Sequence, residues 1–407
     1  MAVKANKGQQ EVFIIDAVRT PVGKVRGVFA NTRSDYLFAC LIKELAKRNK
    51  KVDLGVTDDV IVGCATQEAE QAFNVGRVAA LLGGLPNKVP GMSINRLCSS
   101  GLQSVAIAAD TISLGNADLI IAGGLESMSM VPMIGNKQAF NPALFEDENV
   151  AIAYGMGITA EKVADKYKIT REQQDEYALE SHRRAIAAQD KNAFAKEIVP
   201  IKVSKRTLVD SDQRSIKGRK VHIEKSVVTQ DEGPRRGSSI EVLASLRTVF
   251  AQRGSVTAAT SSQVSDGAGA LLVASEKFVT KHGIKPLAKF HSFAVAGVPP
   301  EIMGIGPSKA IPKVLKKSKL TLEDIGCIEL NEAFAAQTLA VIKDLGLNKE
   351  IVNPLGGAIA LGHPLGATGA IRSATLLHNM KKNKIRYGMT TMCVGVGMGA
   401  AGIFELV

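Results

Sequence analysis

Residues 57–64 (TDDVIVGC) and residues 322–329 (LEDIGCIE) share one pattern, in which acidic residues precede a short apolar run that leads on to a helical segment. Residues 118–124 and 387–395 form a second matched pair, because both run from an apolar strand pattern into glycine. A repeat this widely spaced indicates a duplicated domain, since a solenoid would repeat every 20–50 residues or so. The sequence therefore predicts two related halves.

Short apolar runs alternate with amphipathic helical segments in both halves. The predicted strands are residues 12–15, 60–65, 93–94, 119–123, 327–330, 387–392 and 401–405. The predicted helices are residues 35–48, 75–82, 98–114, 307–317, 333–345 and 367–380. Such alternation is typical of α/β units with a mainly parallel sheet.

The chain has 407 residues, which exceeds the roughly 250–300 at which a single core stops growing. Between the halves the sequence is richer in charge and helix, and residues 170–173 (TREQ) form a capping box that opens a helix to about residue 189. Strand patterns resume at residues 255–260 and 267–275 and are expected to return to the first sheet. We predict a discontinuous first domain (1–130 with 251–282), an inserted loop domain (131–250) and a C-terminal domain (283–407).

Composition excludes several classes of protein. The chain is 45% hydrophobic and 22% charged, which favours a globular fold over disorder. Aromatic residues make up 4% with no Trp, and neither helix-turn-helix nor zinc-finger spacing occurs, so nucleic acid is not an expected partner. No run approaches the roughly 18 apolar residues of a membrane span, and residues 1–10 lack the apolar stretch of a signal peptide. A cytoplasmic location is expected.

The formal net charge of +12 is concentrated in one segment. Residues 202–225 hold eight basic against three acidic residues. A solvated basic flap and a contact surface for a phosphate-bearing ligand both fit this concentration.

The five cysteines are odd in number and lack CxxC or zinc-ligand spacing, so we expect no disulfide scaffold and no metal site. Cys98 lies in residues 93–102 (SINRLCSSGL), where a strand turns into a helix. A helix N-terminus favours the thiolate, which makes Cys98 a candidate nucleophile, although taken alone it also fits a small buried residue, the usual fate of a free cysteine. Cys40, Cys64 and Cys327 fit burial better.

His363 lies in a glycine-rich segment, residues 353–369 (NPLGGAIALGHPLGATG), which predicts a loop that brings backbone close to a ligand. Both a catalytic and a structural role stay open for it. The other histidines are expected at the surface: His182, His222, His282, His291 and His378.

Cys393 opens residues 393–399 (CVGVGMG), whose glycine spacing is not that of a dinucleotide-binding loop. Exposed backbone amides there could instead bind an oxyanion. Asn331 and Glu332 follow the predicted strand 327–330, and strand ends are where open α/β sheets place their sites. Glu332 could alternatively be an acid at a helix start.

Five segments together resemble the thiolase family in order and spacing: those around Cys98, residues 123–129 (GGLESMS), Asn331, His363 and Cys393. The resemblance covers essentially the whole chain. It implies an α/β fold of duplicated thiolase-like domains, with central mixed sheets flanked by helices and an inserted loop domain.

The resemblance also implies roles for individual residues. Cys98 would take up the acyl group as a thioester, His363 would activate it, and Cys393 would act as the second thiol, an acid and base. One oxyanion hole would consist of His363 and a water held by Asn331. The other would consist of the backbone amides of Cys98 and Gly395.

Coenzyme A would be a substrate, with no tightly bound cofactor. Arg235 and Ser262 match the family's nucleotide and pantetheine contacts, and Met156 would line the pocket. The chain departs from the family at residues 259–260, which are Ala-Thr where Gly-Asn is common. Gly155 stands where short-chain biosynthetic members often carry His, and residues 303–307 (MGIGP) look more like the degradative branch.

The implied activity is cleavage of 3-ketoacyl-CoA by CoA to acetyl-CoA and a shortened acyl-CoA, as in fatty-acid β-oxidation. The alternative is an acetoacetyl-CoA thiolase that condenses two acetyl-CoA molecules. A related ketoacyl synthase would carry a second histidine in place of Cys393, and a non-catalytic scaffold would lack the nucleophile. The family usually forms dimers or tetramers, while a hydratase/dehydrogenase partner stays open.

Overall fold

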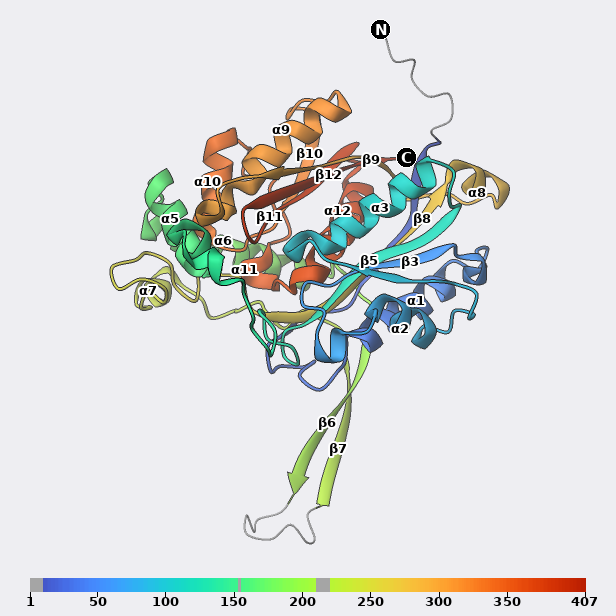
Figure 1. Cartoon of the computed structure of the whole chain (residues 1–407), viewed down its shortest axis with the longest axis horizontal. Coiled ribbons are helices and arrows are strands. Elements are labelled where there is room, and N and C mark those ends of the chain that lie inside the picture. The colour runs from blue at the N-terminus through green and yellow to red at the C-terminus, as the bar shows by residue number, and fades with distance from the viewer. Residues whose placement is uncertain (1–9, 153–154, 210–219) are drawn as a thin grey trace.

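The computed structural model describes residues 10–152, 155–209 and 220–407. Residues 1–9, which contribute to the expectation about targeting, and residues 210–219 of the basic segment lie outside the described residues. In the described part, a ten-stranded sheet has the order β10-β11-β12-β9-β1-β8-β5-β3-β4, with β2 paired to β8 (Figure 1). Its strands are β1 (Val12–Arg19), β2 (Gly23–Lys24), β3 (Asp59–Gly63), β4 (Met92–Ile94), β5 (Leu119–Ser127), β8 (Ser265–Ser275), β9 (Ala288–Gly297), β10 (Ile325–Leu330), β11 (Tyr387–Val394) and β12 (Met398–Leu406).

Strand order shows the duplication directly. In the first half β3 pairs parallel with β5, and β5 with β8 and β8 with β1 pair antiparallel. In the second half β10 pairs parallel with β11, and β11 with β12 and β12 with β9 pair antiparallel. The two sets meet where β1 pairs with β9. The resemblance's implied mixed α/β sheet is confirmed.

The expectation of a mainly parallel sheet is wrong. Among the described strands only β3–β4, β3–β5 and β10–β11 are parallel pairs. Strand β12 follows β11 after a three-residue turn, residues 395–397, and a connection that short can only join antiparallel neighbours. Residues 255–260 are also no strand, since the only bridge there joins Thr257 to Thr248.

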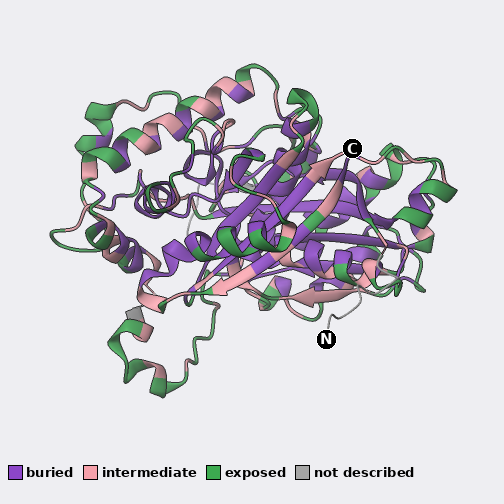
Figure 2. Ribbon diagram, turned by 90° about the horizontal axis from the view of Figure 1, so that it is seen from above, coloured by how far each residue is buried: buried purple, intermediate pink, exposed green. Residues whose placement is uncertain are grey.

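Helices form layers on both sides of each half-sheet. Helices α1 (Ser34–Arg48) and α2 (Val75–Leu82) pack on one face of the first half, and α9 (Gly306–Ser318) and α10 (Ala335–Leu345) on one face of the second. Helices α3 (Ser100–Ser113) and α12 (Leu365–Asn383) share a third core with strands of both halves (Figure 1). The buried residues gather along these strands and central helices (Figure 2).

The remaining elements lie mostly in the insertion. They are α4 (Glu148–Ile152), α5 (Met156–Tyr167), α6 (Arg171–Asp190), β6 (Ile201–Val209), β7 (Lys220–Val228), α7 (Ile240–Ala244), α8 (Glu276–Lys281) and α11 (Ala358–Leu361). Thr170 and Gln173 form the predicted capping box of α6. Strands β6 and β7 form a ribbon that projects from the body (Figure 1). None of the described helices is long and apolar enough to cross a membrane.

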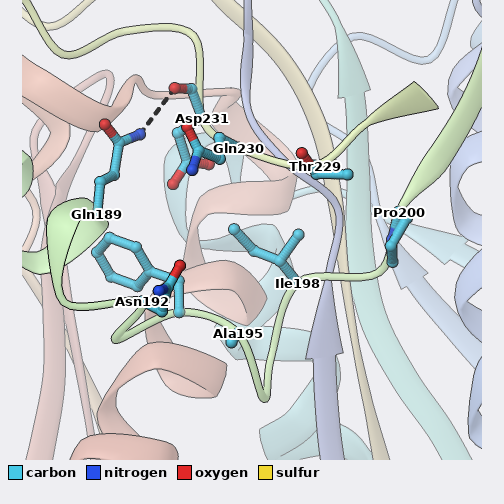
Figure 3. Close-up of a pocket in the computed structure, with 9 residues that line it drawn as sticks. Gln189, Asn192, Ala195, Ile198, Pro200, Thr229, Gln230 and Asp231 are labelled. Atoms are coloured by element: carbon cyan, nitrogen blue, oxygen red, sulfur yellow. Dashed lines mark hydrogen bonds between the residues drawn. The ribbon is translucent and has the colours of Figure 1, made fainter. Parts of the chain in front are cut away.

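A buried ion-pair cluster joins the first strand to the insertion. Arg19 of β1 donates to Glu197 at 2.6 Å and to both carboxylate oxygens of Asp231 at 2.7 and 3.0 Å. Beside it, a cavity of about 260 Å³ opens between the end of α6 and residues 229–231, where Gln189 donates to the Asp231 carbonyl (Figure 3). Removing one partner of such a pair would leave a buried charge uncompensated.

The two central helices pack backbone to backbone through glycine. A Cβ on Gly101 of α3 would lie 2.8 Å from the backbone nitrogen of Ala370 and 2.8 Å from the carbonyl oxygen of Gly366. A Cβ on Gly369 of α12 would collide with the backbone nitrogen of Leu102. Any larger residue at either position would force the helices apart.

We expect Gly369→Ala to destabilise the protein by roughly 1–3 kcal/mol, as overpacking does. Helix propensity alone would give the opposite sign, because alanine stabilises an exposed helix interior relative to glycine by about 1 kcal/mol. The matched control is Gly237→Ala, where a Cβ meets no atom within 4 Å. Thermal unfolding of the wild type, Gly369→Ala and Gly237→Ala shows whether the Gly369 substitution lowers or raises stability. An unfolding midpoint for Gly369→Ala at or above the wild-type value would contradict the packing argument.

Candidate active site

Cys98 lies on a strained turn at the start of α3. It is the middle residue of a 3-10 turn, Leu97–Ser99, and Leu97 has φ +44°, which is rare for a residue other than glycine. The turn is held by the side chain of Ser100, which donates to the Leu97 carbonyl at 2.7 Å and accepts from the backbone of Arg96 at 2.8 Å. Backbone strain of this kind collects at functional sites.

Burial dominates the electrostatics of Cys98. It raises the pKa of the thiol to about 11, although hydrogen bonds from the backbone N–H groups of Gly395 and of Cys98 itself oppose the shift. The nearby carboxyl of Glu126 raises this pKa further. The N–H groups at the helix start do favour the thiolate, as expected, but desolvation of the buried thiol outweighs them in the free protein.

Cys393 approaches Cys98 from the other half of the chain. It lies near the end of β11 and is fully buried. Burial, and then the charge of Cys98, raise the pKa of its thiol. It packs in an apolar cluster with Ala160, Val256, Met303, Ala333 and Phe334, with Met156 at the edge. The following residues form the β11–β12 turn, so the glycine spacing serves a hairpin and not a dinucleotide.

His363 lies just before α12 and is held by hydrogen bonds of its backbone and of its ring. Its backbone N–H donates to the Gln263 carbonyl at 3.1 Å, and Gly362 before it has φ +99°. In the ring, Nδ1 lies 2.6 Å from Thr368 Oγ1, and Nε2 lies 3.4 Å from Asn331 Nδ2. Burial, and then the charge of Arg372, lower the pKa of His363 to about 3. The imidazole is therefore neutral at physiological pH.

Asn331 follows β10 directly, as predicted. Its side-chain Oδ1 is buried and has no hydrogen-bond partner among the described residues. A buried polar atom left open in this way is a suitable partner for an ordered water. The neighbouring Glu332 accepts from Tyr177, Ser181, Asn353 and the backbone of Ile359. The helix start it contacts is that of α11, while the predicted helix after it begins at Ala335.

The three candidate CoA-binding residues lie in different parts of the structure. Arg235 is exposed and its backbone N–H donates to His182 Nδ1 at 3.2 Å. Ser262 is half-buried and its N–H donates to the Ala333 carbonyl at 2.9 Å, beside Asn331. Met156 is half-buried at the edge of the Cys393 cluster. The role of each in CoA binding stays a prediction.

Sequence reasoning placed His182 at the surface, and this is wrong. Only 5% of it is exposed, because α6 buries that face, and burial and then Arg235 lower its pKa to about 4. It supports the backbone at Arg235.

Sequence reasoning also gave no role to Glu126, Thr368 or Arg372. Glu126 accepts from the backbone N–H groups of Ala65, Thr66 and Gly366, and so ties β3, β5 and α12 together. A carboxylate two residues after a pair of glycines, near the end of a buried strand, is the pattern that could have indicated it.

Within the described ranges, no group of three His, Cys, Asp or Glu side chains is placed to hold a metal ion. The arrangement instead offers two thiols, a neutral imidazole and backbone N–H groups at one sulfur. These groups suit acyl transfer through a thioester.

The comparisons with known proteins agree with this chemistry. Family models match for the thiolase N-terminal domain over residues 12–277 and the thiolase C-terminal domain over residues 284–406. The chain is 48% identical to a "3-ketoacyl-CoA thiolase" of Bacillus subtilis (strain 168), over 98% of this chain and 100% of the relative. It is 44% identical to a "Beta-ketoadipyl-CoA thiolase" of Acinetobacter baylyi, with the same shares covered.

Solved structures give the same result. A crystal structure of the Bacillus anthracis acetyl-CoA acetyltransferase superposes with a TM-score of 0.86 at 38% identity, covering 99% of this chain and 100% of that one. Human mitochondrial 3-ketoacyl-CoA thiolase superposes with a TM-score of 0.86 at 37% identity, covering 98% and 99%. The chain therefore belongs to the thiolase family and is an acyltransferase.

Proposed function

We propose that this enzyme cleaves 3-ketoacyl-CoA with CoA, giving acetyl-CoA and an acyl-CoA shortened by two carbons, with Cys98 as the acyl carrier. The observation that carries the proposal is the meeting of two buried thiols from different halves of the chain, with the Gly395 amide on the Cys98 sulfur. Thioester exchange requires one thiol to hold the acyl group and a second group to move protons at the same place.

The proposed first half-reaction begins at Cys98. Its proton passes to the neutral ring of His363, and the thiolate attacks the 3-keto carbon of the substrate. The bond between C2 and C3 breaks, the acyl group stays on Cys98 as a thioester, and Cys393 protonates the α-carbon of the departing acetyl-CoA. His363 and a water on Asn331 would stabilise the enolate oxygen.

In the second half-reaction the Cys393 thiolate takes the proton of an incoming CoA thiol. The CoA thiolate attacks the thioester, and the shortened acyl-CoA leaves as Cys98 regains its proton from His363. The N–H groups of Cys98 and Gly395 already face the Cys98 sulfur, which supports them as donors to the thioester oxygen. CoA would be a substrate throughout, held in part by Arg235 and Ser262.

The wall around Cys393 supports an apolar acyl group. It contains Met303 and Phe334, and Phe250 packs edge-on against Phe334 at 6.0 Å between ring centroids. Behind the wall, the Glu161 carboxylate accepts from the backbone N–H of Val256 at 2.9 Å. A substrate that ended in a carboxylate would meet apolar side chains and a like charge. We therefore favour simple 3-ketoacyl chains, as in fatty-acid β-oxidation, over 3-oxoadipyl-CoA.

Condensation of two acetyl-CoA molecules is the second candidate. The similarity to an acetyl-CoA acetyltransferase in structure favours it. It uses the same residues in the reverse direction, with Cys393 removing the α-proton of the second acetyl-CoA.

Substrate comparison separates these candidates. We expect thiolysis of 3-ketodecanoyl-CoA to have the highest kcat/KM, with 3-oxoadipyl-CoA at least about tenfold lower, because each buried CH₂ contributes about 0.8 kcal/mol and a carboxylate is costly to bury unpaired. Activity confined to acetoacetyl-CoA would favour the condensing enzyme. A preference for 3-oxoadipyl-CoA would contradict the apolar-wall argument.

Replacing the nucleophile should abolish turnover. We expect Cys98→Ala to lower kcat by about 10³-fold or more, since loss of a covalent nucleophile removes the whole acyl-enzyme route. The matched control is Cys327→Ala, a buried thiol of β10 that hydrogen-bonds with Asn379. Its kcat should stay within about threefold of wild type. Comparable activity in both variants would exclude Cys98 as the acyl carrier.

The raised pKa of Cys98 predicts the pH dependence of its alkylation in the free enzyme. Only the thiolate reacts with iodoacetamide, so with a pKa of about 11 the rate should rise about tenfold per pH unit up to pH 10. Mass spectrometry of the Cys98 peptide follows the reaction, and Cys98→Ala identifies that peptide. A rate that levels off below pH 9 would show that the N–H donors outweigh burial.

A further inference from the structure

The protonation site on the His363 ring is determined by its two side-chain neighbours. Nε2 faces Asn331 Nδ2 and Nδ1 faces Thr368 Oγ1, and both His363 and Thr368 are almost completely buried. In this orientation of the Asn331 amide its NH₂ group donates to Nε2, which places the ring proton on Nδ1. From there it points at the Thr368 hydroxyl, 2.6 Å away.

From this geometry we infer that Thr368 is a positioning residue, whose hydroxyl fixes His363 as the Nδ1-protonated tautomer and so keeps Nε2 unprotonated, where the Cys98 proton can replace the hydrogen bond from Asn331. The inference rests on the proposed function, in which His363 is the base for Cys98. Thr368 itself touches no reacting atom.

Thr368 is well placed to hold the ring. It lies on the first turn of α12, which begins at Leu365, and among the described residues its hydroxyl has no other hydrogen-bond partner. The backbone of His363 is already fixed by the bond from its N–H to Gln263. The freedom that remains is rotation of the imidazole, and the Thr368 hydroxyl restricts it.

The neutrality of this partner also matters for the reaction. A carboxylate at the same place would stabilise the imidazolium and retain the proton on the ring. A hydroxyl orients the ring without doing so, and the charge of Arg372 acts against the imidazolium. His363 can therefore return the proton when the acyl group leaves Cys98.

The test measures the single-turnover rate constant for acylation of Cys98 by a 3-ketoacyl-CoA, together with the KM for CoA. We expect Thr368→Val, which keeps the shape but lacks the hydroxyl, to lower acylation about 10–100-fold, since a general base contributes about 10²–10⁴-fold and loss of its orientation forfeits part of that. The KM for CoA should change by less than about twofold. Thr368→Ser should restore acylation to within about threefold of wild type.

The matched control is Thr375→Val on the same helix. Thr375 is equally buried and donates to Glu197 at 2.7 Å, so this variant loses a comparable hydrogen bond away from the ring. It should acylate like wild type. If Thr368→Val does not fold, the pair Thr368→Ala and Thr368→Ser makes the same comparison.

The outcomes separate this inference from the proposed function. Wild-type acylation in Thr368→Val, with acylation lost in His363→Ala, would overturn the role of Thr368 alone. Wild-type acylation in His363→Ala would overturn the proposed mechanism itself. An equal loss in Thr368→Val and Thr375→Val would reduce Thr368 to a structural residue.

Discussion

The close approach of α3 and α12 is the constraint on which the rest of the structure depends. Cys98 lies two residues before α3 and His363 two residues before α12, so the separation of the two helix starts sets the separation of the proposed nucleophile and base. Glycines at 101 and 369 let the two backbones touch. The low aromatic content of the chain is consistent with this, because bulky side chains could not fill so narrow an interface.

Burial of the two thiols and the imidazole has electrostatic consequences. It raises the pKa of both thiols and lowers that of His363, so all three groups are uncharged before substrate binds. Moving the Cys98 pKa from 9.0 to about 11 adds about 3 kcal/mol to the cost of ionising it at a fixed pH. The backbone N–H groups of Gly395 and Cys98 offset part of that cost at the sulfur, and in the proposed mechanism the proton passes to His363 only as the sulfur attacks.

Local pattern was enough to predict most elements, and long-range contacts explain the failures. Helix 75–82 and the capping box at Thr170 depend on nearest neighbours, and both are confirmed. The antiparallel direction of β8 and the presence of β9 depend on the strands they pair with. The alternation of apolar and helical segments along the sequence could therefore not predict either of them. The burial of His182 and the sign of the Cys98 shift depend on segments far away in the chain. The candidate residues were found because their motifs are local, whereas Thr368 and Glu126 act through contacts that no single motif contains.

Duplication also explains why the site lies between the halves. The end of β5 in the first half contacts the start of α12 in the second half, and the end of β11 in the second half contacts the start of α3 in the first half. Glu126 at the end of β5 accepts the N–H of Gly366 at the start of α12, and Gly395 after β11 donates its N–H to Cys98 at the start of α3. The two contacts occupy related places but have opposite polarity, a carboxylate in one and an amide donor in the other. The Glu126 contact is thus a structural tie, whereas the amide donors at Cys98 are groups of the kind that the proposed oxyanion site requires.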